Sequence, residues 1–336
     1  MVRRVKKKKS GIRIFVTFLL MVGITAFVYK YVITLGYQNI LERKYDDKTS
    51  AYSSLKMTPN SSDADKTPAT PKKELCISPD KLNSPNAILI RLKDNTVVMQ
   101  KNCEKKIFPA SMTKIMTAIV AIENLPDLKE EIKLTNSMFE GLFEANAALA
   151  GFQPGENVRG IDLIYGVLLP SGAESCIALA NQIAGSEQGF VKMMNQKAVD
   201  LSMDNTHFEN TTGLHDENHY TTVKDLTILL SYALQNDTFR EVFTSPRHST
   251  GPTNRHPDGI TFYSTMFKGL KDQYLIGGEI LGGKTGYTDE AGLCLASLAK
   301  VGKQEYILVS AGAKGDNRSE QFNITDAIAV YSSLGK

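Results

Sequence analysis

An almost continuous apolar run occupies positions 14–35 near the start of the chain and is interrupted only at Lys30. A membrane-spanning helix needs roughly 20 such residues, and a lysine near its end can extend to the interface. Residues 1–13 carry several bases and no acid, as is typical of the cytoplasmic side of a span. We therefore predict a cytoplasmic tail at 1–13 and a single transmembrane anchor at 14–35. A cleaved signal peptide is the alternative, although bulky residues end the run where a cleavage site needs small ones.

The pattern turns polar over residues 36–74, where prolines are scattered among Ser, Thr, Asn, Asp and Lys. Such a segment cannot bury enough apolar surface to fold, and it is expected to be a flexible linker outside the cytoplasm. Regular patterning begins near Cys76, so residues 75–336 are predicted to form the folded domain. With its N-terminus in the cytoplasm, the protein is expected at the cell membrane with this domain extracytoplasmic.

Short apolar runs bounded by turn residues predict strands at both ends of this domain. The runs 86–93 and 96–100 flank Asp94-Asn95 and indicate a β-hairpin. Three more strands are expected at 279–286, 292–299 and 305–311. Strands from the two ends of a domain can join in one antiparallel sheet, and the helical sequence between them would cover both of its faces. The expected fold class is therefore α/β of the α+β type, with part of the helices forming a subdomain.

Helical periodicity dominates the region between the strands. Helices are expected at 111–124, 160–184, 187–203 and from Thr221 or Thr222 to 234, with a closing helix at 318–334. The second of these is interrupted at Leu168-Leu-Pro-Ser-Gly172, because Pro170 and Gly172 break the helical pattern. Residues 247–263 contain prolines and histidines, and they are expected to be irregular.

The charge distribution argues against a nucleic-acid partner. The formal charge of +3 arises from the basic N-terminus, and the rest of the chain is mildly acidic. Four cysteines are present, and none has the spacing of a zinc site. Outside the cytoplasm, Cys76 and Cys103 could form a disulfide or remain free, whereas Cys176 and Cys294 lie in apolar runs and are expected to be buried thiols.

Candidate chemistry begins at Ser111-Met-Thr-Lys114. Two residues three positions apart on a helix share one face, so the serine hydroxyl and the lysine amine can meet. A serine becomes an effective nucleophile only when a neighbouring base accepts its proton. Lysine can be that base if burial or a second cation lowers its pKa from about 10.4.

Two further motifs accompany the first: Ser171-Gly172-Ala173 on the helix break, and Lys284-Thr285-Gly286 on a predicted strand. With the flanking text, including Asn210-Thr-Thr-Gly-Leu214 and Gly283 to Gly292, residues from about 76 onward resemble the penicillin-binding serine D-alanyl-D-alanine carboxypeptidases of low molecular mass. The resemblance implies the fold shared with the serine β-lactamases. It also implies peptidoglycan stem peptides ending in D-Ala-D-Ala as substrates, β-lactams as covalent inhibitors, and no cofactor.

The resemblance also assigns roles to residues. Ser111 would attack the carbonyl between the two D-alanines, Lys114 would accept its proton with Lys284 as the second cation, and Ser171 would relay a proton to the leaving amine. The backbone amides of Ser111 and Tyr287 would hold the oxyanion. The motif residues Lys284, Thr285 and Gly286, together with Arg318, would line the binding site for the terminal carboxylate.

The sequence departs from the family pattern at Ala173, because the second motif ordinarily reads Ser-x-Asn. The missing amide would cost about 1–3 kcal/mol of transition-state binding, or roughly a factor of ten to a hundred in rate. Glu174 or Ser175 could compensate for it. Common members also carry a second, β-rich domain and a C-terminal anchor helix; here the N-terminal span is expected to replace that anchor.

Two other functions use the same motifs. A β-lactamase would need a carboxylate placed to activate water against the acyl-enzyme, and no convincing candidate is found between the second and third motifs. A non-catalytic sensor of wall peptides or β-lactams is conceivable because of Ala173, but it would not need a nucleophile beside two lysines. His215 and His219 are four positions apart, yet Asp216 stands where a zinc peptidase requires Glu, and the segment is expected to be a loop, so no metal site is predicted.

Overall fold

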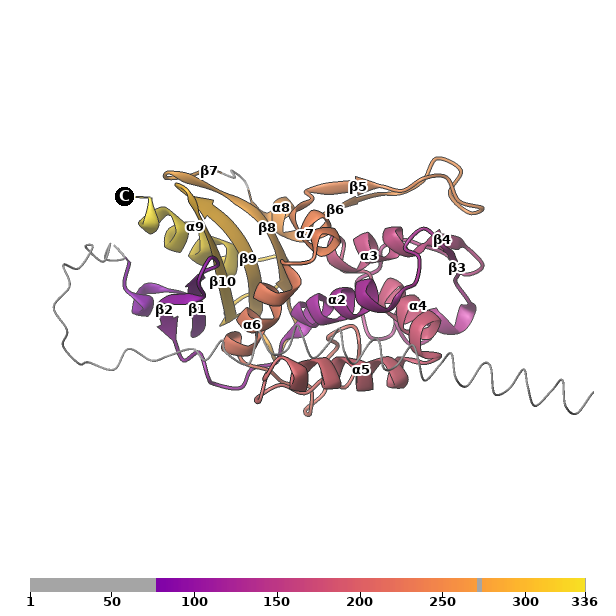
Figure 1. Ribbon diagram of the computed structural model, residues 1–336, viewed down its shortest axis with the longest axis horizontal. Coiled ribbons are helices and arrows are strands. Elements are labelled where there is room, and N and C mark those ends of the chain that lie inside the picture. Colours follow the sequence, from indigo (N-terminus) through magenta and orange to yellow (C-terminus); the bar gives the residue numbers. More distant parts are fainter. Residues whose placement is uncertain (1–76, 271–273, 336) are drawn as a thin grey trace, which may run out of the picture. The chain divides into compact units, whose positions relative to one another are not determined.

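The computed structural model describes residues 77–270 and 274–335, which all belong to one compact unit. Its central sheet contains β1 (Asn86–Arg91), β2 (Thr96–Lys101), β7 (Tyr274–Leu275), β8 (Gly278–Gly286), β9 (Leu293–Val301) and β10 (Gln304–Ala313). These strands are antiparallel in the order β2-β1-β10-β9-β8-β7 (Figure 1). The register pairs Ile88 of β1 with Val309 of β10, so the two ends of the domain meet in one sheet, as the strand pattern predicts.

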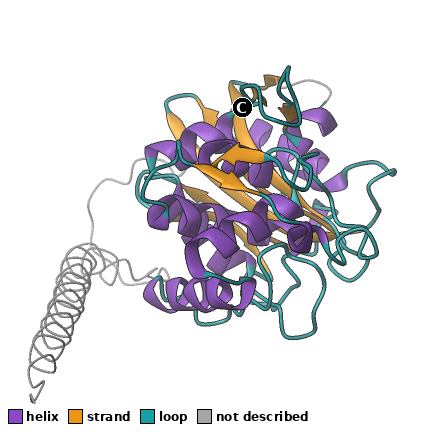
Figure 2. Cartoon of the chain, turned by 90° about the vertical axis from the view of Figure 1, so that its right-hand side faces the viewer, coloured by secondary structure: helices purple, strands orange, loops and turns teal. Residues whose placement is uncertain are grey.

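Helices follow the first hairpin and close the described chain. They are α2 (Lys114–Asn124), α3 (Gly160–Leu168), α4 (Ala173–Ala184), α5 (Glu187–Asp200), α6 (Val223–Ala233), α7 (Asp237–Thr244), α8 (Thr265–Gly269) and α9 (Phe322–Leu334), with 3-10 turns η1 (Pro79–Lys81), η2 (Ala110–Thr113) and η3 (Asn136–Phe139). Figure 2 shows the helices gathered around the sheet. The Thr222 side chain caps α6 by accepting a hydrogen bond from the Asp225 amide.

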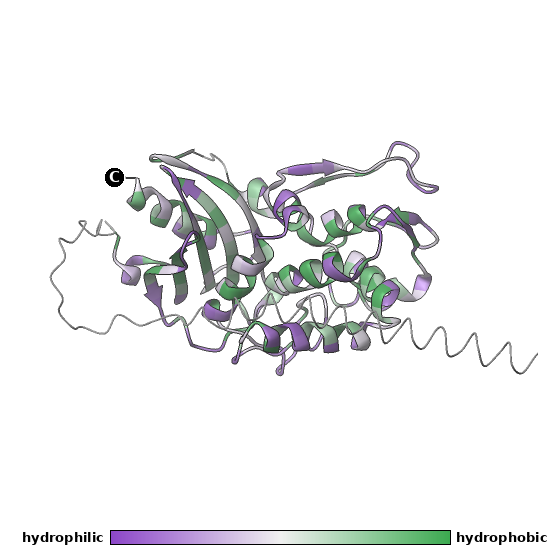
Figure 3. Cartoon of the chain, viewed as in Figure 1, coloured by the Kyte–Doolittle hydropathy of each residue, from purple (hydrophilic) through white to green (hydrophobic). Residues whose placement is uncertain are grey.

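Both faces of the sheet are buried, because alternate residues of each strand enter different cores. Ala87 and Leu89 of β1 pack in the core that contains Tyr331 of α9. Ile88 and Ile90, between and after them, pack in the larger core built around α2 to α6. The strands and α2 are accordingly coloured as largely hydrophobic in Figure 3. The expected arrangement of helices on both faces of an antiparallel sheet is confirmed.

Several boundaries differ from the expectations. Residues 247–263, expected to be irregular, contain the hairpin strands β5 (Arg247–Ser249) and β6 (Thr261–Tyr263), which extend along the helical side in Figure 1. The closing helix begins at Phe322 rather than Arg318. The helices α7 and α8 and the two-stranded sheet of β3 (Glu131–Lys133) and β4 (Asn157–Arg159) were not predicted. Three-residue strands are too short to show a period, so only pairing with a distant partner defines them.

The predicted tail, anchor and linker at 1–13, 14–35 and 36–74 lie outside the described residues, and so does Cys76. Within the part of the chain that is described, no helix has the length and apolar character that crossing a bilayer requires. Cys176 and Cys294 are buried free thiols, as expected.

Candidate active site

The first motif lies where a tight turn becomes a helix. Ser111 belongs to the 3-10 turn η2, and Lys114 is the first residue of α2. Ala110, just before the serine, has a φ of +46°, a left-handed conformation that alanine rarely adopts. This turn places Ser111 Oγ 3.1 Å from Lys114 Nζ, so the predicted contact across one helical face is present.

Ser171 occupies the predicted break between α3 and α4. Its φ of +71° is also left-handed, a conformation that costs a non-glycine residue about 1–3 kcal/mol and tends to occur at functional sites. The turn is closed by a hydrogen bond from the Gly172 amide to the carbonyl of Gly166. Ser171 is only 5% exposed, and its hydroxyl is directed toward the first motif.

Lys284 belongs to the third motif and lies near the C-terminal end of β8. Its side chain is fully buried. Its Nζ donates one hydrogen bond to Ser171 Oγ at 2.9 Å and another to the carbonyl of Thr285, also at 2.9 Å. Ser171 Oγ in turn donates to Ser111 Oγ at 3.0 Å. The three motifs therefore form one continuous chain of hydrogen bonds from Lys114 through Ser111 and Ser171 to Lys284.

Both lysines are in surroundings that disfavour a charged amine. Burial lowers the pKa of Lys114 below the ordinary lysine value of 10.5. Burial and the nearby charge of Lys114 lower the pKa of Lys284 well below the same value. The sequence suggested that a second cation would help to lower the pKa of Lys114, but burial is the main cause there, and the repulsion acts on Lys284. Both shifts favour a neutral amine, which is the form that can accept a proton.

The end of β8 lies directly beside the nucleophile. A Cβ atom at Gly286 would stand 3.1 Å from the backbone nitrogen of Ser111 and 3.1 Å from the carbonyl oxygen of Pro109. Only the absence of a side chain allows this approach without displacement. The peptide that joins Gly286 to Tyr287 is therefore close to the Ser111 amide, the arrangement in which two amides can face one oxyanion.

The remaining predicted binding residues differ in how far they join the network. Thr285 is half-buried, and its hydroxyl shares a 2.7 Å hydrogen bond with that of Thr265. The Tyr287 hydroxyl donates to Asp289 at 2.6 Å, which raises the pKa of Tyr287 to about 12. Arg318 lies in the exposed loop before α9, and no hydrogen bond or ion pair joins its guanidinium to any other described residue.

Neither proposed substitute for the missing motif amide is available. Ala173 is buried, with 1% of its surface exposed. The Glu174 carboxylate accepts hydrogen bonds from the amides of Ala150 and Gly151, and Ser175 is wholly buried. With both side chains enclosed in the protein, neither is exposed to contact a substrate in place of the missing amide.

Some functional neighbours were not identified from the sequence. The carbonyl of Thr212, in the Asn210–Leu214 segment, accepts a 2.5 Å hydrogen bond from Lys114 Nζ. A backbone carbonyl is present at every position, so the sequence cannot indicate which one makes this contact. His219 is buried, and its Nε2 lies 2.8 Å from the Thr113 hydroxyl. His215 instead packs edge-on against Phe108. The two histidines thus make separate contacts in a loop, and the described residues contain no group of His, Cys, Asp or Glu side chains suited to a metal ion.

Comparison with known proteins agrees with this geometry. A family model described as D-alanyl-D-alanine carboxypeptidase matches residues 73–315. D-alanyl-D-alanine carboxypeptidase DacF of Bacillus subtilis is 35% identical over 68% of this chain, and DacC of Escherichia coli is 33% identical over 70% of it. The chain spans only 57% and 58% of those two proteins.

A solved structure shares the fold. The crystal structure of a Streptomyces DD-transpeptidase superposes with a TM-score of 0.68 at 25% identity, and the match covers 76% of this chain and 98% of that one. The fold is thus that of the DD-peptidases, with an antiparallel sheet and helices around it. Since the family model covers well over half of the residues, this chain belongs to the D-alanyl-D-alanine carboxypeptidase family.

Proposed function

We propose that this protein is a serine peptidase that removes the terminal D-alanine from peptidoglycan stem peptides ending in D-Ala-D-Ala, and that β-lactams acylate the same serine. One observation carries the proposal: the hydrogen-bonded chain from Lys114 through Ser111 and Ser171 to Lys284. A nucleophile between two lysines of lowered pKa suits acyl transfer. A binding protein would gain nothing from that chemistry.

Acylation begins with a proton transfer from Ser111 to Lys114. The carbonyl of Thr212 holds one N–H of Lys114, which leaves the lone pair of the neutral amine free to face the serine hydroxyl. Ser111 Oγ bonds to the carbonyl carbon between the two D-alanines, and the amides of Ser111 and Tyr287 stabilise the resulting oxyanion. The carbon–nitrogen bond then breaks, and the proton passes from Lys114 by way of Ser171 to the departing D-alanine amine.

Deacylation uses the same groups, with water in place of the serine hydroxyl as the nucleophile. A water molecule gives its proton to Lys114 and attacks the ester, and Ser111 recovers a proton as the shortened peptide leaves.

Before acylation, Lys284, Thr285 and Gly286 at the end of β8 bind the terminal carboxylate of the substrate. Arg318 supplies positive charge from the loop before α9. These substrate contacts are inferred from the side-chain chemistry and from the family.

The names of the relatives support this assignment. Both DacF and DacC are named D-alanyl-D-alanine carboxypeptidases, and the matching Streptomyces structure is named a DD-transpeptidase. Carboxypeptidases and transpeptidases share the acylation step and differ in whether water or an amine takes the acyl group. The same acyl-enzyme therefore accounts for both names.

The test measures D-alanine release. The purified full chain is incubated with a peptide ending in D-Ala-D-Ala and, separately, with a fluorescent penicillin. We expect D-alanine release and slow, stable labelling, both abolished by Ser111→Ala and both retained by Ser249→Ala on the exposed strand β5. Rapid penicillin turnover would instead identify a β-lactamase. Reversible peptide binding with neither reaction would identify a sensor.

We also propose that residues 14–35 anchor the protein in the bacterial cell membrane and that the catalytic domain, residues 75–336, faces outward through the linker 36–74. The basic residues before the apolar run and the extracytoplasmic location of peptidoglycan support this orientation. Protease added to intact protoplasts should degrade the domain. A chain lacking residues 1–35 should leave the membrane fraction, and its retention there would contradict the proposal.

A further inference from the structure

One irregular segment, residues 148–156, crosses the active-site turn and is held by two fully buried glutamates. We call this segment the strap. Much of its surface is exposed, and it forms no helix or strand. Segments of this kind move unless specific contacts fix them. Glu174 on α4 and Glu156 within the strap itself supply side-chain contacts that fix this one, in addition to its backbone hydrogen bonds to Leu134 and Ala173.

Glu174 ties the strap to the first turn of α4. Its Oε1 atom accepts hydrogen bonds from the amide of Ala150 at 2.7 Å and from the amide of Gly151 at 2.9 Å. In the opposite direction, the amide of Ala173 donates to the carbonyl of Ala148 at 2.8 Å. The strap and the start of α4 are thus joined by three hydrogen bonds.

The same contacts close around the left-handed turn at Ser171. A Cβ atom at Gly172 would stand 2.7 Å from Cβ of Ala150 and 2.9 Å from its nitrogen, so the strap packs directly on this turn. Ser171, with its φ of +71°, is held in a strained conformation only if its surroundings prevent relaxation. Through the strap, the Glu174 carboxylate supplies part of that constraint.

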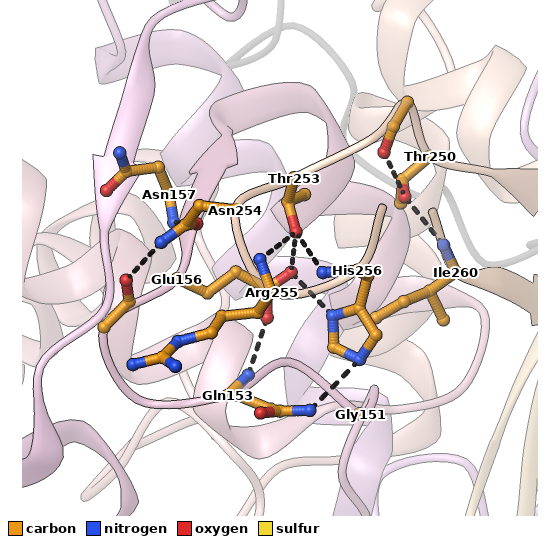
Figure 4. Close-up of polar contacts among 12 residues, drawn as sticks. Gly151, Gln153, Glu156, Asn157, Thr250, Thr253, Asn254, Arg255, His256 and Ile260 are labelled. Atoms are coloured by element: carbon orange, nitrogen blue, oxygen red, sulfur yellow. Dashed lines mark hydrogen bonds and ion pairs between the residues drawn. The ribbon is translucent and has the colours of Figure 1, made fainter. Parts of the chain in front are cut away.

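Figure 4 shows the second point of attachment, between the strap and the β5–β6 connection. Glu156 accepts hydrogen bonds from the Thr253 hydroxyl at 2.6 Å, from His256 Nδ1 at 2.9 Å and from the amide of Gln153 at 2.8 Å. Both glutamates therefore stabilise the strap. Of the two, only Glu174 is part of the first turn of α4, and its charge influences the pKa of Lys114.

The charge of Glu174 reaches the proposed base. Cys176 and Glu174 both raise the pKa of Lys114 and oppose the lowering that burial causes, while Lys114 lowers the pKa of Lys284. Burial also raises the pKa of Glu174 itself, and its buried Oε2 accepts no hydrogen bond within the described residues. A buried carboxylate with one unpartnered oxygen is unfavourable for folding, so its retention calls for a role beyond packing.

We propose that Glu174 is a positioning residue for acylation of Ser111: its carboxylate binds the strap across the Ser171–Gly172–Ala173 turn and so helps to hold the Ser171 hydroxyl against Ser111. This inference rests on the proposed function, because it assumes that Lys114 is the base for Ser111. It assigns two separable effects to one side chain. The hydrogen bonds of the Glu174 carboxylate to the strap affect the rate of acylation. The negative charge of the carboxylate affects how that rate depends on pH.

Glu174→Gln tests the charge. Glutamine has nearly the same shape, and its carbonyl oxygen can still accept both strap amides. Without the negative charge, Lys114 loses its proton more easily, so the acid limb of the rate of labelling by a fluorescent penicillin should move about 0.3–1 pH unit lower. If the wild type is acylated normally and the acid limb of a folded Glu174→Gln protein does not move, this inference is overturned while the proposed function stands.

Glu174→Asp tests the geometry. Aspartate keeps the charge but is one methylene shorter, so it withdraws from the amides of Ala150 and Gly151. Acylation should slow about tenfold or more, with the acid limb nearly in place. Acylation of this variant at the wild-type rate overturns the proposal.

Glu156→Gln is the matched control, because it alters an equally buried strap carboxylate. It should lower the melting temperature and leave the acid limb in place. A shift equal to that of Glu174→Gln would mean that loosening the strap, rather than the Glu174 charge, moves the limb, and would also overturn the proposal. A wild type that is not labelled at all refutes the proposed function, and this inference with it.

Discussion

Lys284 Nζ donates a hydrogen bond to Ser171 Oγ at 2.9 Å, although the two residues are 113 positions apart in the chain. Ser171 passes the connection on to Ser111 at 3.0 Å. A strand and a helix break thus meet at one hydroxyl, which connects the nucleophile to the second lysine. Several measurable consequences depend on this contact and on the packing around it.

Ser171→Ala removes the hydroxyl that bridges Ser111 and Lys284. Because this group is proposed to relay the proton to the leaving amine, D-alanine release should fall roughly 10²–10⁴-fold while the fold persists. The measurement is the rate of release from a D-Ala-D-Ala peptide. Ser175→Ala, which alters a buried hydroxyl in the first turns of α4 that has no hydrogen-bond partner among the described residues, is the control and should retain activity. Equal losses in the two variants would contradict the assigned relay.

Gly286→Ala places a methyl group between β8 and the nucleophile turn. The new Cβ would meet the Ser111 nitrogen and the Pro109 carbonyl at 3.1 Å, so the strand end must move away from the oxyanion position. Acylation by a fluorescent penicillin should slow about tenfold or more, since misplacing one oxyanion donor costs up to 10²–10³ in rate. At Gly251 a Cβ would have only one neighbour within 4 Å, at 3.9 Å, so Gly251→Ala should leave the rate unchanged.

His219 makes folding stability depend on pH. Burial lowers its pKa from 6.5 to about 4, so the folded protein binds this proton less readily than the unfolded chain does. The associated stability is fully present above pH 6.5 and is lost as the pH falls toward 4, by about 2–3 kcal/mol in the free energy of unfolding.

Urea denaturation at several pH values measures this effect. His219→Gln, which does not titrate, should be less stable than the wild type at pH 7 and should lose less stability between pH 6.5 and 4. Identical slopes for the two proteins would show that carboxylates alone cause the acid destabilisation.

Tyr331 stabilises the sheet face opposite the catalytic network. Its buried hydroxyl accepts a hydrogen bond from the Leu308 amide at 2.9 Å and donates to the Ser297 carbonyl at 3.0 Å. Tyr331→Phe leaves that amide unpaired, so the free energy of unfolding should fall by about 1–3 kcal/mol.

Penicillin labelling should continue at the wild-type rate in Tyr331→Phe, because α9 covers the other side of the sheet. Tyr263→Phe, at a tyrosine that is 46% exposed, should change neither property. Loss of labelling by Tyr331→Phe in a folded protein would show that the two faces are coupled.

The accuracy of the sequence-based predictions follows the range of the interactions involved. The hairpin before residue 102 and the strands that carry Lys284 and Leu308 were predicted because short apolar runs bounded by turn residues are a local signal. Ser111 and Lys114 could be paired because helical spacing brings them together in one turn. Arg318 was placed on a helix that begins four residues later, because Gln321 at the start of α9 makes no side-chain capping bond and no cap residue in the sequence marks that start.

The role of Glu174 could not be read from the sequence, because its partners are backbone amides of a segment more than twenty positions away. The same holds for the hairpin of β5 and β6, whose strands are paired across a long connection. In each case the decisive interaction is a backbone contact, and backbone groups are the same at every position.

By itself, the sequence determined which elements form and which side chains are available: the serine, the two lysines and the helix break at Ser171. The tertiary structure alone decided that these groups converge, that Lys284 is completely enclosed, and that Ser171 is held in a left-handed conformation. The physical reason is that hydrophobic periodicity is encoded over a few neighbouring residues. Desolvation and strain, in contrast, depend on atoms that distant parts of the chain bring together.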